Sequence, residues 1–235
     1  MALFSPPTRE YSAFIFDCDG TLADSMPLHQ KAWISALREF GATFDFTWEL
    51  FMSRAGKTIE LTVTELNAEF GLDLDPVLVA AAQRAQFDAL SVGVQPLDEV
   101  VAYARERAKA GCPVSVASGG DAPTVRRTLQ AIGVSDLFSV VVTAEEVTHG
   151  KPAPDLFLFA AGALGEAPSD AIVIEDSPLG IAAARAAGMR SIGFVGASHV
   201  SSDLRERLKA AGADLIVDAM VDLPGAIATL SGRKS

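Results

Sequence analysis

The chain has 235 residues, which is enough for one large domain or for a core domain with a smaller insert. Hydrophobic residues make up 49% and charged residues 21% of it, values typical of a soluble globular protein. Thirty acidic residues against nineteen basic ones give a net charge of −11, and no basic run offsets this excess, so the sequence argues against a nucleic-acid partner. An anionic substrate would have to be attracted by local cations or by a metal ion.

The absence of a visible targeting signal and the pattern of the cysteines favour a cytoplasmic protein. The N-terminus shows no basic stretch followed by a long apolar run, and no segment looks membrane-spanning. Cys18 and Cys112 lie far apart without the spacing of a metal site, which indicates two reduced structural thiols. We therefore predict a cytoplasmic protein with no membrane partner, and we expect a monomer.

The first predicted strand, residues 14–16, is a continuous apolar run, as expected for a strand buried on both faces of a parallel sheet. It stops at Asp17 and Asp19, and Gly20 begins the turn that follows. Ligands of open α/β sheets bind outside the carboxyl ends of the strands, so this pair lies where chemistry is expected. One Asp alone would fit a turn or helix cap better. The assignment therefore depends on the other strand ends.

The segment after this strand is predicted to be all-helical. Ser25 and Pro27 begin a helix that Gly41 ends, and helical patterns follow at 47–55, 58–70 and 76–91. We predict a helical cap domain at residues 25–95 and a core domain formed by residues 1–24 and 96–235. Residues 1–10 are expected to be a polar arm, and 231–235 a frayed tail.

Strands and helices alternate in the rest of the chain. Apolar strands are predicted at 113–117, 139–143, 171–174, 191–195 and 214–217, with helical segments between them. This order is typical of βαβ crossovers. The predicted fold class is α/β, with a Rossmann-like parallel sheet and a small all-helical cap inserted after the first strand.

Polar residues follow three of these later strands. Ser118 and Gly119 follow the strand predicted at 113–117, and Lys151 follows the strand at 139–143. Glu175 and Asp176 follow the strand at 171–174. Taken alone, Ser-Gly-Gly is best explained as a loop, and a lone lysine as a solvated surface residue. Two adjacent acids at a buried strand end are costly unless a cation neutralises them. Their hard oxygen ligands suit Mg²⁺.

These strand ends together resemble the haloacid dehalogenase superfamily. Its hallmark is Asp-x-Asp-Gly-Thr on the first strand, which residues 17–21 match, and a serine or threonine, a lysine and paired acids follow on later strands. The helical insert after the first motif matches the family's small cap. Residues 150–155 and 175–184 are similar to the beta-phosphoglucomutase-like subfamily, which includes hexose-phosphate mutases and small sugar-phosphate phosphatases.

The resemblance implies catalytic and metal-binding roles. Asp17 would be the nucleophile that forms an aspartyl-phosphate, and Asp19 would protonate the leaving oxygen and then activate water. Mg²⁺ would be held by Asp17, by the backbone carbonyl of Asp19, by Asp176, and by Glu175 directly or through water. Because true dehalogenases of this fold lack the second Asp, that branch is disfavoured.

The same resemblance assigns a phosphate site. Ser118 and the Gly119 amide would bind the transferring phosphoryl group, and Lys151 would bind both this group and the nucleophile.

The cap offers candidates for contact with the organic part of the substrate: His29, Trp33, Arg54, Lys57 and Thr58. His29 lies where the subfamily often has a histidine, although a solvent-facing helical histidine fits equally well. Trp33 fits the cap core better than a substrate site. Arg54 and Lys57 would supply local positive charge, or they lie on the surface without a role.

Three functions are considered. The favoured one is a Mg²⁺-dependent phosphatase acting on a small sugar phosphate, and the second is a phosphohexomutase on the same scaffold. Beta-phosphoglucomutases bind the second phosphate of their bisphosphate intermediate largely through a cap arginine, and in the corresponding stretch here, residues 56–60, Ile59 is expected at that position. An isoleucine makes no bidentate phosphate contact, so the sequence favours hydrolysis. The third, a catalytically silent binding protein, is disfavoured because all the core motif residues are present.

Overall fold

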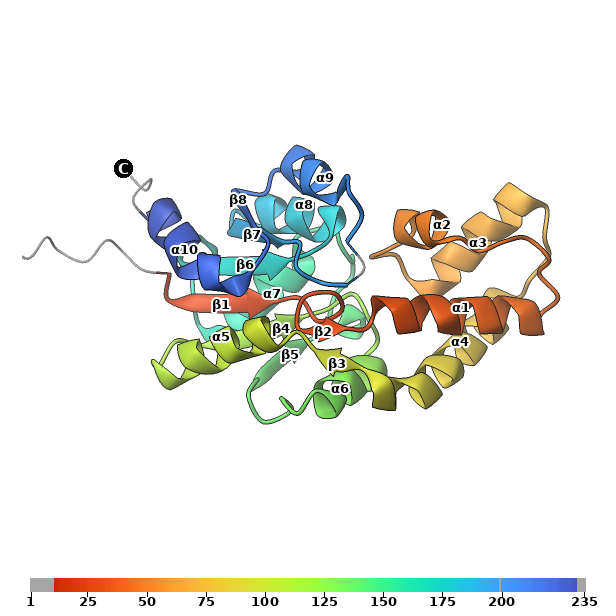
Figure 1. The fold of residues 1–235 in the computed structure, drawn as a ribbon, viewed down its shortest axis with the longest axis horizontal. Helices are drawn as coiled ribbons and strands as arrows, with labels where there is room; N and C mark the ends of the chain where they lie inside the picture. The colour runs from red at the N-terminus through yellow and green to blue at the C-terminus, as the bar shows by residue number, and fades with distance from the viewer. Residues whose placement is uncertain (1–10, 199, 232–235) are drawn as a thin grey trace, which may run out of the picture.

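The computed structural model describes residues 11–198 and 200–231, so the predicted N-terminal arm and residues 232–235 of the predicted tail lie outside the described residues. Its centre is a six-stranded sheet in the order β5-β4-β1-β6-β7-β8, and every neighbouring pair is parallel (Figure 1). The strands are β1 (Ala13–Phe16), β4 (Val114–Ala117), β5 (Val140–Val142), β6 (Ala171–Glu175), β7 (Arg190–Phe194) and β8 (Leu215–Val217).

Helices cover both faces of this sheet, because its central strand β1 has apolar side chains on both faces. Phe14 and Phe16 point to one face, where they join a core with α5 (Asp98–Lys109), α6 (Ala122–Ala131) and α10 (Leu223–Ser231). Ala13 and Ile15 point to the other face, because successive side chains of a strand alternate. There they pack with α7 (Asp155–Leu164) and α8 (Pro178–Ala186), and α9 (Leu204–Ala211) packs on α8.

The insert contains four helices, which project from one end of the sheet (Figure 1). They are α1 (Met26–Glu39), α2 (Trp48–Ser53), α3 (Ile59–Phe70) and α4 (Pro76–Leu90). Side chains cap three of their N-termini, since Thr47, Thr58 and Asp75 accept hydrogen bonds from the first turns of α2, α3 and α4. The insert has a hydrophobic cluster of its own, whose buried members are Met26, Trp33, Ala36, Leu37, Ala42, Phe46, Phe51, Val63, Leu66 and Val79.

The two ends of the insert are held together by a short antiparallel pair that the sequence did not predict. β2 (Ala23–Asp24) pairs with β3 (Gln95–Pro96), so the chain leaves and re-enters the core at one point. Four short 3₁₀ helices complete the description: Ser91–Gly93, Ala144–Glu146, Pro168–Asp170 and Met220–Asp222.

The predicted fold class is confirmed: the sheet is parallel, helices flank it, and the helical cap follows the first strand. The predicted strands match the observed ones to within one residue at each end. The domain limits of 1–24 with 96–235 and 25–95 remain a prediction, consistent with the β2–β3 pair. In the part of the chain that the structure describes, no helix is long and apolar enough to cross a membrane.

Candidate active site

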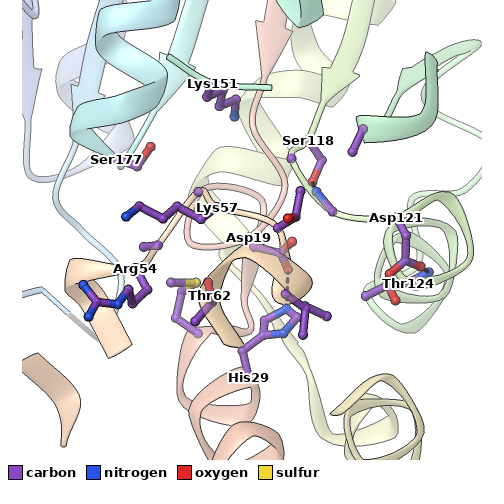
Figure 2. Close-up of a pocket in the computed structure, with 18 of the residues that line it drawn as sticks. Asp19, His29, Arg54, Lys57, Thr62, Ser118, Asp121, Thr124, Lys151 and Ser177 are labelled. Atoms are coloured by element: carbon purple, nitrogen blue, oxygen red, sulfur yellow. Dashed lines mark hydrogen bonds and ion pairs between the residues drawn. The ribbon is translucent and has the colours of Figure 1, made fainter. Parts of the chain in front are cut away.

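The candidate site lies at the carboxyl edge of the sheet, below the cap. β1 is central, with β4 and β6 as its neighbours. The strands β4 and β5 lie on one side of β1 and the later strands β6 to β8 lie on the other, so the strand order reverses at β1. This is the position at which open α/β sheets bind ligands. Asp17 follows β1, Ser118 follows β4, Glu175 ends β6, and Lys151 comes from the loop between β5 and α7. They line one cavity of about 290 Å³ together with Asp19 and cap residues (Figure 2).

Lys151 links two of the acids. Its Nζ donates to Oδ1 of Asp17 at 2.5 Å and to Oε2 of Glu175 at 2.8 Å, and all three side chains are buried. Burial by itself lowers the pKa of Lys151, but the two carboxylates outweigh it and raise the pKa above its ordinary value. The lysine therefore stays an ammonium ion beside Asp17 and Glu175.

Glu175 is fixed on both of its oxygens. Oε2 accepts from Lys151, while Oε1 accepts from the backbone N–H groups of Asp176 and Ser177 at 3.2 and 2.9 Å. The start of α8 lies so close that a Cβ at Gly180 would fall 1.9 Å from Oε2, so only glycine fits there. Gly180, which follows Ser-Pro-Leu, thus leaves room for the buried carboxylate of Glu175.

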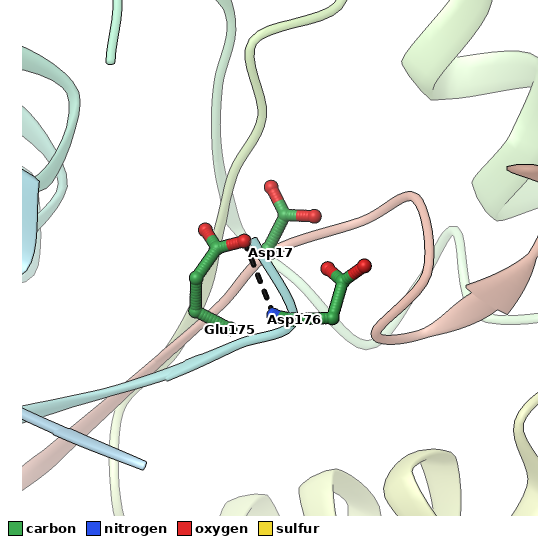
Figure 3. A group of neighbouring side chains, drawn as sticks. All are labelled: Asp17, Glu175 and Asp176. Atoms are coloured by element: carbon green, nitrogen blue, oxygen red, sulfur yellow. Dashed lines mark hydrogen bonds between the residues drawn. The ribbon is translucent and has the colours of Figure 1, made fainter. Parts of the chain in front are cut away.

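Three carboxylates gather at one point, as Figure 3 shows. Asp17, Glu175 and Asp176 are all buried, and each places an oxygen within 4.8 Å of the others. The Thr21 hydroxyl donates to Oδ1 of Asp176 at 3.0 Å and orients it. Burial, and next the negative charge of Glu175, raise the pKa of Asp17 well above its ordinary value, although Lys151 opposes them. A divalent cation with a preference for oxygen ligands would relieve this crowding, and the donor set fits Mg²⁺.

Asp19 has a different environment, created by the start of α1. Its Oδ1 accepts from the Ser25 hydroxyl at 2.6 Å and lies 3.2 Å from Nε2 of His29. Burial alone would raise the pKa of Asp19, but the charge and hydrogen bond of His29 and the bond from Ser25 outweigh it and lower the pKa. His29 is stacked on Phe87, with ring centroids 3.7 Å apart. The structure thus places His29 against Asp19, and the solvent-facing interpretation does not fit.

The Ser118–Gly119 loop presents hydrogen-bond donors to the cavity. The Ser118 oxygen accepts from the Gly120 N–H at 3.1 Å. Among the described residues, neither the Ser118 hydroxyl hydrogen nor the Gly119 N–H has a protein acceptor. Both are thus available for an anion at this edge.

The predicted cap residues border the same cavity, but their charges are already paired. Lys57 donates to both oxygens of Glu65 at 2.6 and 2.8 Å, and Arg54 contacts Glu65 at 3.3 Å and also pairs with Glu69. The Thr58 hydroxyl accepts from the first turn of α3 and so acts as its cap.

Trp33 is buried and packs on Phe46, at 5.6 Å between ring centroids, and it also borders the cavity. The core interpretation of Trp33 therefore agrees with the structure.

Sequence reasoning missed several cavity residues, which share a position on inner helix surfaces or at a helix start: Glu60, Thr62, Gln83, Arg84 and Asp121. Arg84 donates to Glu60 at 2.8 Å and to Asp121 at 3.0 Å, which joins α4 to α3 and to the N-cap residue of α6. A signal was present in α4, since Gln83 falls on its apolar face, but an apolar pattern alone does not show that this face meets a cavity.

Comparisons with known proteins agree with this geometry. The sequence matches the haloacid dehalogenase-like hydrolase family over residues 11–188. The fructose-1-phosphate phosphatase YqaB of Escherichia coli K12 is 35% identical over 188 residues, which cover 78% of this chain and 96% of that protein. Hexitol phosphatase A of the same organism is 33% identical over 181 residues, 76% of this chain and 81% of its own. A beta-phosphoglucomutase from Clostridium difficile, 24% identical, shares the fold with a TM-score of 0.78 over 93% of this chain and 97% of its own.

The chain therefore belongs to the haloacid dehalogenase-like hydrolase family, and the predicted resemblance is confirmed. The protein is a hydrolase, and its phosphatase relatives support the prediction of a phosphoric monoester hydrolase.

Proposed function

We propose that this protein is a Mg²⁺-dependent phosphatase that hydrolyses a small sugar phosphate through an aspartyl-phosphate intermediate. The observation that carries the proposal is the position of Asp17, at the end of the central strand, in contact with Lys151 and beside Asp19 in one cavity. A nucleophile, a cation and a second carboxyl group are the parts that phosphoryl transfer through an enzyme ester needs.

The proposed reaction has two steps. In the first, a carboxylate oxygen of Asp17 attacks the phosphorus, the ester P–O bond breaks, and the leaving oxygen takes a proton from Asp19. In the second, Asp19 takes a proton from water, the water oxygen attacks the phosphorus, and the bond to Asp17 breaks. Inorganic phosphate leaves, and both side chains return to their starting states.

Three groups of the core would hold the transferring phosphoryl group. The Lys151 ammonium lies against Asp17, the Ser118 hydroxyl can donate to a phosphoryl oxygen, and so can the Gly119 N–H. Fixed donors and cations of this kind stabilise the charge that develops in the transition state.

The acidic cluster supports a bound Mg²⁺. Asp17 and Asp176 would be ligands, and Glu175 would bind directly or through water. The backbone carbonyl of Asp19 would be the remaining protein ligand. When bound, the ion offsets the charge of carboxylates and phosphate and lets the two anions approach.

The cap favours hydrolysis over the mutase alternative. Ile59 lines the cavity, where a mutase would need a firm site for a second phosphate. The cavity-lining cations of the cap, Arg54, Lys57 and Arg84, each already contact carboxylates. A second phosphate would have to displace these partners. The silent-protein alternative stays disfavoured, because the core motif residues meet in one cavity.

The substrate class rests on the named relatives, a fructose-1-phosphate phosphatase and a hexitol phosphatase. We propose a phosphorylated sugar or polyol of similar size as the partner of this site. The monomeric state and the cytoplasmic location remain predictions.

The test combines two assays. Phosphate release is measured over sugar and polyol monophosphates with Mg²⁺, and net hydrolysis is expected. A second assay supplies β-glucose 1-phosphate with a trace of the 1,6-bisphosphate and compares glucose 6-phosphate with free phosphate. Glucose 6-phosphate formed much faster than phosphate would show a mutase instead.

A further inference from the structure

Two neutral polar side chains line the cap part of the cavity without a protein partner. Thr62 of α3 and Gln83 of α4 are each 2% exposed, and both border the cavity that contains Asp17. Within the described residues, neither the Thr62 hydroxyl nor the Gln83 amide group forms a hydrogen bond. Figure 2 shows Thr62 on the cap side of the cavity with His29, across from Lys151.

Thr62 and Gln83 are buried as whole residues, but their polar atoms are open to the cavity. Most buried polar side chains have a hydrogen-bond partner, because leaving one without a partner costs free energy. Neither residue forms part of the proposed phosphoryl-transfer machinery. Their shared position at one cavity indicates a ligand that provides the missing partners.

The surroundings restrict the chemistry of that ligand. Apolar side chains of Met26, Trp33 and Phe51 border the same space, and Arg54 and Lys57 are neutralised by glutamates. A neutral amide and a neutral hydroxyl in such a wall match neutral groups that both donate and accept, as alcohol hydroxyls do. The cavity of about 290 Å³ lies near the lower limit of ~300 Å³ typical of small-molecule sites, which fits a small ligand.

We propose that Gln83 and Thr62 form a hydroxyl-recognition subsite, which makes the enzyme select polyhydroxylated phosphate monoesters over esters without hydroxyl groups. The inference rests on the proposed function, because the phosphoryl group must lie at Asp17 for the organic part to reach the cap. Gln83 and Thr62 are thus specificity residues that touch the substrate and take no part in the transfer of the phosphoryl group.

The experiment removes hydrogen-bonding capacity at nearly constant volume. Gln83→Met, Thr62→Val and the double variant are compared with Gln86→Met, a control on the same helix outside the cavity. Substrates are sorbitol 6-phosphate and fructose 1-phosphate, against p-nitrophenyl phosphate, whose organic part has no hydroxyl group. For the hydroxylated esters we expect kcat/KM to fall about tenfold or more in each cavity variant. For p-nitrophenyl phosphate and for the control variant, we expect less than about a threefold change in kcat/KM, because no bond to a substrate hydroxyl is lost.

Stability provides a second readout. Since Gln83 and Thr62 have no partner in the protein, the apolar variants should melt at the wild-type temperature or above it. A structural role would lower the melting temperature instead. A loss of selectivity at unchanged or higher stability supports the subsite.

Other outcomes overturn it. Equal losses on all three substrates, or unchanged selectivity, would refute the hydroxyl subsite and leave the phosphatase proposal intact. A wild-type enzyme that hydrolyses only p-nitrophenyl phosphate would refute both the subsite and the proposed sugar-phosphate substrate class. A wild-type enzyme that releases phosphate from none of the three would overturn the proposed function and the inference with it.

Discussion

Nζ of Lys151 lies 2.5 Å from Oδ1 of Asp17, although the two residues are 134 positions apart in the chain. The contact is buried and includes Glu175, so one cation lies between two carboxylates. Removing one member of a buried ion pair leaves uncompensated charge, which costs about 3–5 kcal/mol.

Lys151→Met is therefore expected to destabilise the metal-free protein by about 3–5 kcal/mol, measured by urea unfolding at pH 7. Phosphatase activity should also fall, because the phosphoryl group loses a cation. The exposed Lys109→Met, at the end of α5, is the control and should change stability by less than about 0.5 kcal/mol. A Lys151→Met protein as stable as wild type would contradict the buried pair.

Asp17→Asn should abolish turnover, with a loss of about a thousandfold or more, because the amide is not a nucleophile. The fold should persist. Since the pKa of Asp17 is raised in the fold, the ionised carboxylate costs stability there, and an amide of the same shape removes that cost while Lys151 keeps its pairing with Glu175. Phosphate release and circular dichroism are the measurements. Substantial activity in a folded variant would rule out the covalent mechanism.

Asp19→Asn should slow both leaving-group departure and hydrolysis of the phosphoenzyme. With p-nitrophenyl phosphate, whose leaving group needs little protonation, the second defect dominates and phosphoenzyme accumulates. Intact-protein mass measurement after rapid quench detects the added phosphate. Absence of the adduct, together with normal turnover of a sugar phosphate, would be incompatible with the role given to Asp19.

Activity should require Mg²⁺ and disappear in excess chelator. Mg²⁺ should also raise the melting temperature, because the ion binds the folded cluster and not the unfolded chain. Asp176→Asn should lose most of this Mg²⁺-dependent rise, whereas Asp155→Asn, outside the cluster, should keep it. Full activity after exhaustive metal removal would refute the requirement.

His29→Asn should shift the pH profile. Asp19 must be ionised to take a proton from water, and its lowered pKa keeps it ionised as pH falls. Without His29 the pKa of Asp19 rises, so the acidic limb of kcat should move to higher pH. The profile is measured with p-nitrophenyl phosphate, and His149→Asn, at an exposed position, is the control. An unchanged acidic limb would exclude coupling between His29 and Asp19.

The sequence by itself determined the fold class and the core of the site. Apolar runs specify buried strands, and the order of strands and helices specifies a parallel sheet. Since parallel strands end at one edge, Asp17, Ser118 and Asp176 were expected to meet there, and they do. Lys151, from the loop after β5, joins them in the same cavity.

Only the tertiary structure decided what each cap residue contacts. His29 had two equal interpretations, because helical periodicity does not show which element packs on a given helix face, and the stacking on Phe87 settled its place. Arg54 and Lys57 also had two interpretations, a source of local positive charge or surface residues without a role, and the fold of α3 brings Glu65 to both of them. Gln83 lies on the apolar face of α4, but that pattern did not show that the face meets a cavity. A buried polar residue on an apolar helix face differs from a core residue only through the space beside it, and that space forms when the cap and the sheet come together.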